Sequence, residues 1–203
     1  MNKRLGLVGF GLSILAISST IGLAQAPLIP FHAKIQRIQQ TFGTNGSLEV
    51  EESITDDYAL NSQGSAYTES EIIDSITGQM TGSLKILESA RDGRTYLIDE
   101  VKKTVVIAPH QSQTKQFQPD PSLQRKTCLD RTCAVYPPQE GSEVWVDVEL
   151  GYPMYERREI LLAGGGKMVR VSRVTEITVN QEPDPKLFIV PSFSGYSVTD
   201  LTR

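Results

Sequence analysis

The sequence predicts a mainly β protein of the α+β class, and three observations carry this prediction. Apolar and polar residues alternate with period two along several segments, which is typical of strands with one buried face and one wet face. Dipeptides that favour tight turns, such as Asn45-Gly46 and Asp92-Gly93, separate these segments. Helical spacing is weak and confined to two short stretches. An antiparallel sheet with few helices is therefore expected.

The clearest alternation lies between residues 143 and 179. One side of a predicted strand over 143–150 is apolar: Val144, Val146, Val148 and Leu150. Further strands are expected over 155–162 and 168–179, and in the latter Val169, Val171 and Ile177 fall on one face. Gly164-Gly165-Gly166 lies between these two strands and predicts a hairpin tip. The three strands should form a meander.

The other segments are interpreted in the same way. Residues 48–54 alternate, and residues 94–99 and 104–108 predict a hairpin. Phe31 to Phe42 is ambiguous, because its apolar residues fit helical spacing while Phe31, Ala33 and Ile35 also alternate as in a strand. Glu71 to Met80 is a weak helix candidate. Gln111 to Gly141, rich in Pro, Gln and Ser, is expected to be a long irregular connection.

The N-terminus has the pattern of a secretory signal peptide. Lys3 and Arg4 precede an apolar run over residues 5–17, and a small-residue exit follows. Cleavage near Ala24-Gln25 is expected, which leaves residues 25–203 as one domain in the periplasm or outside the cell; an uncleaved membrane anchor is the alternative. The exported chain would carry 18 basic residues (20 minus Lys3 and Arg4) against 24 acidic ones, a net charge of −6. This charge disfavours nucleic acid as a partner.

Both cysteines lie in the hexapeptide CLDRTC, at Cys128 and Cys133. A catalytic redox pair is usually C-x-x-C at a helix N-terminus. Here four residues separate the two cysteines, and no helix is predicted around them. Two cysteines without a competitor tend to oxidise together in an exported protein. A structural disulfide within a loop is therefore expected, with about 2 kcal/mol of stabilisation from chain entropy.

Few residues suggest catalysis or metal binding. The two histidines, His32 and His110, are far apart, no G-x-S-x-G elbow is present, and His110 is interpreted as a solvated loop residue. Asp147 and Glu149 share a predicted strand face with Trp145, an arrangement that a glycosidase could use, but we favour the interpretation that this is a polar outer face with one amphipathic Trp. The Cys and His content does not fit a zinc site, and no metal or cofactor is predicted.

Several short motifs resemble those of LolA-like bacterial exported proteins. They are Thr95-Tyr96-Leu97-Ile98-Asp99 with Lys103 and Val105 to Pro109, then Glu149-Leu150-Gly151-Tyr152-Pro153, Val171 to Val179, and Glu182 to Pro191, with Tyr58-Ala59 and Gln63-Gly64-Ser65 upstream. The resemblance covers about residues 95–198. It implies a half-barrel, a curved antiparallel sheet covered by a few helices, whose hollow holds acyl chains in the lipoprotein carriers.

Three functions follow as hypotheses. The first is an exported, non-enzymatic protein that binds a lipid, an acyl chain, a lipoprotein or another apolar ligand. Its lining would be Val144, Val146, Val148, Leu150, Val169, Val171 and Ile177. The second is an envelope structural or interaction protein with an envelope protein partner and a closed core. The third, less favoured, is a hydrolase that uses Asp147 and Glu149 or His110.

Overall fold

The structure is a computed structural model that describes residues 28–74, 80–110, 119–139 and 141–202. The predicted signal peptide and its cleavage point lie outside these residues. The strands are β1 (Phe31–Phe42), β2 (Leu48–Leu60), β3 (Ala66–Asp74), β4 (Met80–Ser89), β5 (Arg94–Asp99), β6 (Thr104–Pro109), β7 (Gln124–Cys128), β8 (Arg131–Gln139), β9 (Ser142–Asp147), β10 (Pro153–Leu161), β11 (Lys167–Val179) and β12 (Ser197–Asp200). A 3-10 turn, η1, spans Pro185–Phe188.

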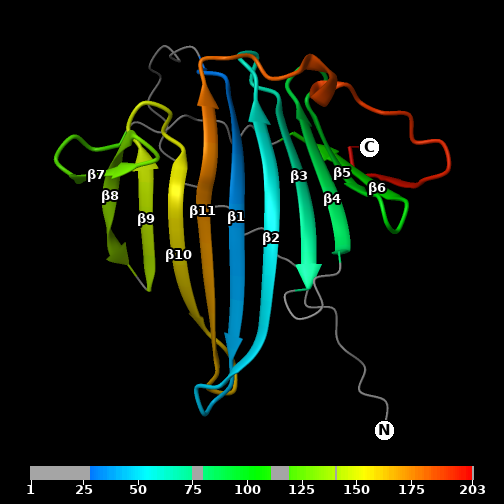
Figure 1. Cartoon of the computed structure of the whole chain (residues 1–203). Helices are drawn as coiled ribbons and strands as arrows, with labels where there is room; N and C mark the ends of the chain where they lie inside the picture. The colour runs from blue at the N-terminus through cyan, green and yellow to red at the C-terminus, as the bar shows by residue number, and fades with distance from the viewer. Residues whose placement is uncertain (1–27, 75–79, 111–118, 140, 203) are drawn as a thin grey trace, which may run out of the picture.

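These strands form one open, curved sheet (Figure 1) in the order β12-β6-β5-β4-β3-β2-β1-β11-β10-β9-β8-β7. Every pair of neighbouring strands in this order, starting at β6 and ending at β7, is antiparallel, as predicted. The predicted hairpin of β5 and β6 and the predicted meander of β9, β10 and β11 are confirmed. The short edge strand β12 departs from the prediction, because it runs parallel to β6.

The predicted covering helices are absent from the described residues, whose helical structure is the single turn η1. Phe31 to Phe42 is a strand, held between β2 and β11, so pairing with two neighbours decides a pattern that the sequence left open. The helix candidate at Glu71 to Met80 is wrong where it can be compared: Glu71 belongs to β3 and Met80 begins β4. No helix of the described chain is long and apolar enough to cross a membrane.

The expected irregular connection over Gln111 to Gly141 contains a hairpin instead. Strands β7 and β8 pair from Gln124 with Val135 to Cys128 with Arg131. The β8–β9 register shifts between Tyr136 and Gln139, at the two prolines that cannot donate to a ladder. The prolines interrupt the strand locally and do not abolish it.

The sheet carries one core on each face. Following the register from strand to strand, Phe31, Ala33 and Ile35 of β1 share a face with Leu60 and Tyr58 of β2, here called the Phe31 face. The opposite surface, the Tyr96 face, has its core on β4 to β6: Leu87, Tyr96, Ile98, Val105 and Ile107. The C-terminal segment, residues 185–200, packs Phe188, Val190, Phe193 and Tyr196 against that core.

Candidate functional site

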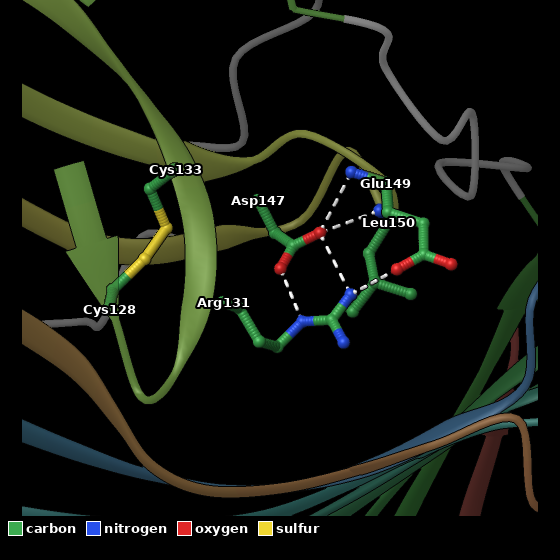
Figure 2. The surroundings of a disulfide bond; sticks show 6 residues. All are labelled: Cys128, Arg131, Cys133, Asp147, Glu149 and Leu150. Carbon is green, nitrogen blue, oxygen red and sulfur yellow. Dashed lines mark hydrogen bonds and ion pairs between the residues drawn. A yellow bond between two sulfur atoms is a disulfide. The ribbon is translucent and has the colours of Figure 1, made fainter. Parts of the chain in front are cut away.

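The CLDRTC hexapeptide forms the tight hairpin that joins β7 to β8. Leu129 and Asp130 have φ of 48° and 59°, and two central residues with positive φ are the mark of a type I′ turn, which matches the twist of a hairpin. Cys128 and Cys133 form the predicted disulfide across this turn (Figure 2). The predicted pairing of the two cysteines is confirmed.

Arg131, the next residue after the turn, reaches back to the end of β9. Its Nε donates to Asp147 Oδ2 at 2.5 Å, and its Nη2 donates to Asp147 Oδ1 at 3.1 Å and to Glu149 Oε2 at 2.9 Å (Figure 2). Asp147 is 1% exposed. Its Oδ1 also accepts from the backbone N–H of Glu149 and of Leu150, at 2.9 and 2.8 Å. One buried carboxylate thus holds both the hairpin and the turn after β9.

This contact set gives Asp147 and Glu149 a structural role. Both carboxylates are bound by the same guanidinium, and Asp147 is out of reach of a substrate because it is buried. The described residues also hold no cluster of three or more His, Cys, Asp or Glu side chains that could bind a metal. We therefore place no active site at this turn.

The turn after β9 projects onto the Phe31 face. Leu150 and Met154 are buried in the core there, and Tyr152 packs against it. The rings of Phe31, Tyr58 and Tyr152 form a cluster with centroids 4.9 to 5.4 Å apart. Burial raises the pKa of both tyrosines, so they are neutral phenols. The cysteine hairpin therefore positions the turn that closes one end of this face.

A charged group lies in the middle of the same face. Arg37 Nη2 donates to Asp56 Oδ1 at 2.5 Å, and the Ser70 hydroxyl donates to the same oxygen at 2.6 Å. Asp56 is 3% exposed. A buried carboxylate needs such a partner, because an unpaired charge in an apolar surrounding is strongly destabilising. Arg37 thus neutralises the buried Asp56 carboxylate on the Phe31 face.

A second polar pair, Glu88 and His110, lies at the end of β4 and β6. Glu88 is on the Phe31 face, since it pairs with Ala66 and Thr95. His110 Nδ1 is buried without a hydrogen-bond partner, and it lies 3.9 Å from Glu88 Oε2. Burial raises the pKa of the Glu88 carboxyl, and His110 opposes that rise. The interpretation of His110 as a solvated loop residue is wrong, because its side chain is 10% exposed.

Between these polar pairs lies a row of half-buried apolar side chains. Ile86 pairs with Leu97, and Leu97 with Val106, so the three lie side by side on the Phe31 face of β4, β5 and β6. Each is intermediate in exposure, whereas the opposite surface of the same strands is buried under the C-terminal segment. These strands are apolar on both faces, and one face is incompletely covered.

The structure separates the residues that the sequence grouped as a lining. Val146 and Leu150 are buried, while Val148 lies in the turn after β9. The pairing of β1 with β11 contains a bulge. Lys34 and Ile35 are consecutive on β1, but their partners on β11 are Glu176 and Val174, so Thr175 is an extra residue of β11. The register therefore puts Val169 and Val171, opposite Gln40 and Ile38, on the Tyr96 face, and Ile177, opposite Ala33, on the Phe31 face.

Sequence reasoning missed the Glu88–His110 pair and the apolar row. The alternation Ile86–Glu88 and Val106–Ala108–His110 is visible in the sequence, but the opposite faces of both strands are apolar too. A strand that is apolar on both faces reads as a continuous run without a preferred side. The pairing register was needed to choose the side.

A half-open groove of about 900 Å³ lies outside the Phe31 face. The β2–β3 turn, the β4–β5 turn and the C-terminal segment line it: Asn61, Ser62, Gln63, Ser65, Ser89, Arg91, Asp92, Glu182, Pro183, Pro185, Phe188, Ile189 and Val190. Ile189 is 65% exposed there. None of the seven residues predicted to line a ligand site belongs to this groove.

No known protein family matches the sequence, and no curated protein matches it. Among solved structures, the chain is similar to MucB of Pseudomonas aeruginosa in complex with MucA, with 16% identity, a TM-score of 0.42, and coverage of 82% of this chain and 57% of that chain. The chain thus spans somewhat more than half of the MucB chain.

Two further structures are similar. A DUF1329 family protein from Desulfovibrio piger shows 8% identity and a TM-score of 0.35, with 79% of this chain and 89% of that chain covered. An outer membrane lipoprotein-sorting protein domain from Vibrio parahaemolyticus shows 8% identity and a TM-score of 0.34, with 78% of this chain and 88% of that chain covered. All these TM-scores are below 0.5.

Proposed function

We propose that the protein is exported and non-enzymatic, and that it binds a lipid or another apolar ligand on the Phe31 face. The observation that carries the proposal is the half-buried apolar row of Ile86, Leu97 and Val106. Each methylene that a ligand buries there contributes about 0.8 kcal/mol, so a chain of moderate length would bind.

Export is supported by the disulfide and by the predicted signal peptide. Disulfides persist in oxidising compartments and are rare in the cytosol. The buried carboxylates of Asp56 and Asp147 are bound by Arg37 and Arg131 of the same chain. Because these carboxylates are already paired, they support a binding role over catalysis.

The test combines native mass spectrometry with a binding assay. Protein purified from its host should carry a co-purifying lipid, and after delipidation it should take up the fluorescent probe N-phenyl-1-naphthylamine. Leu97→Gln should weaken probe binding about tenfold or more, because a buried amide without a partner costs 1–3 kcal/mol. Leu161→Gln is the matched control, since Leu161 is 81% exposed and its substitution should change nothing. A ligand-free mass together with no probe uptake would refute the proposal.

The alternative is an envelope interaction protein whose sheet is closed by its own side chains. The observation that favours it is the groove beside the C-terminal segment, where Ile189 is exposed next to Arg91 and Glu182. Crosslinking in the host envelope from position 189 distinguishes the two, because a protein adduct there without lipid on the Phe31 face supports only the alternative.

A further inference from the structure

We infer that the ligand of the Phe31 face carries a hydroxyl group, which bridges Glu88 and His110. This inference rests on the proposed function and names the chemistry of the ligand. It begins from the 3.9 Å between Glu88 Oε2 and His110 Nδ1.

That separation is too long for a direct hydrogen bond, which needs about 2.7–3.2 Å. It suits one oxygen atom placed between the two groups at hydrogen-bond distance from each. His110 Nδ1 is buried and has no hydrogen-bond partner. A buried polar atom without a partner is rare in proteins and calls for a specific cause, such as a bound molecule.

The two groups lie beside the apolar row. Glu88 follows Ile86 on the same face of β4, and His110 follows Val106 by two alternations along the end of β6. A ligand chain over Ile86, Leu97 and Val106 would therefore bring its polar end to the pair. The pair thus lies one step of the strand alternation from the row on β4 and two steps from it on β6.

The charges on this face select among head groups. Asp56 is neutralised by Arg37, and Glu156 by Arg158, whose Nε donates to Glu156 Oε1 at 2.5 Å. Arg170 also lies on this face, on β11, where it donates to Gln39. At the Glu88–His110 pair itself, Glu88 would repel a carboxylate or phosphate. In the tautomer that carries the proton on His110 Nδ1, an ammonium group could donate to Glu88 but could not accept a hydrogen bond from that N–H. A hydroxyl does both.

The experiment compares two isomers as competitors of N-phenyl-1-naphthylamine on delipidated protein purified from its host. One is 1-tridecanol and the other is dodecyl methyl ether, which has the same atoms but no O–H donor. The alcohol should bind roughly tenfold more tightly, the usual value of one hydrogen bond in a buried site. Tridecanoate should bind more weakly than the alcohol.

Variants assign the preference to the pair. Glu88→Met removes the acceptor and should bring the ratio of the two affinities to about one, while the probe still binds. Glu71→Met is the matched control, because Glu71 is exposed and lies on the opposite face of β3, and it should keep the full ratio. Equal affinities in the unchanged protein would show that water bridges the pair and would overturn the inference alone. A preference for the alcohol that survives Glu88→Met would also overturn the inference. Absence of probe binding to the unchanged protein would refute both the inference and the proposed function.

Discussion

Replacement of Asp147 by alanine should destabilise the protein more than any change at the neighbouring exposed carboxylate. The carboxylate is 1% exposed and accepts from the Arg131 guanidinium and from two backbone N–H groups. Each lost backbone bond costs about 1 kcal/mol. Breaking a buried ion pair costs roughly 3–5 kcal/mol. Arg131 is 20% exposed and keeps its ion pair with Glu149, so we assign about 1–2 kcal/mol to the loss of the Arg131–Asp147 ion pair.

The sum is about 3–4 kcal/mol, and for a domain of this size it lowers the Tm by roughly 10 °C. Thermal unfolding followed by circular dichroism, together with urea titration, measures it. Glu149→Gln is the control, because Glu149 is 55% exposed and its exposed ion pair should contribute less than about 1 kcal/mol. If Asp147→Ala shifts the Tm no more than Glu149→Gln does, Asp147 does not hold the hairpin and the turn together.

Two further changes are predicted. The double variant Cys128→Ser, Cys133→Ser should lose about 2 kcal/mol in denaturant titration, because a loop this short gains that much from closure, and probe binding should stay within about twofold; a loss of binding at equal stability would contradict the structural role. Glu88→Gln should raise the Tm at pH 7, because burial raises the pKa of Glu88 and its ionised form opposes folding. That advantage should disappear below the ordinary Glu pKa of 4.5, where the carboxyl is protonated in both the folded and the unfolded chain; an advantage that grows on acidification would refute the sign.

The antiparallel strands were predictable because period-two alternation reports burial directly. Residues 94–99 and 104–108, with a turn between them, became β5 and β6. The sequence left one segment open between helix and strand for a different reason. Spacing in Phe31 to Phe42 satisfied two periods at once, and pairing on both sides with β2 and β11 decided between them.

The candidate site was less accessible to sequence reasoning, because a bulge changes which residues share a face. Thr175 adds one residue to β11, and a shift of one residue moves every later side chain to the other side of the sheet. Val171 and Ile177 therefore separate, although strict alternation placed them together. The disulfide was predictable because it is local, with a separation of five residues.

The cysteine hairpin and the Phe31 face are linked by a continuous set of contacts. The disulfide closes the β7–β8 turn, Arg131 after the turn binds Asp147, and Asp147 caps the turn that carries Leu150. Tyr152 in the same turn packs against Phe31 at 4.9 Å. A hairpin at the edge of the sheet thus fixes one end of the proposed ligand face, whereas Glu88 and His110 lie at the far strands β4 and β6. Loosening the hairpin should therefore lower stability before it changes ligand selectivity, because the groups proposed to select the ligand lie on β4 and at the end of β6, which pair with neither β7 nor β8.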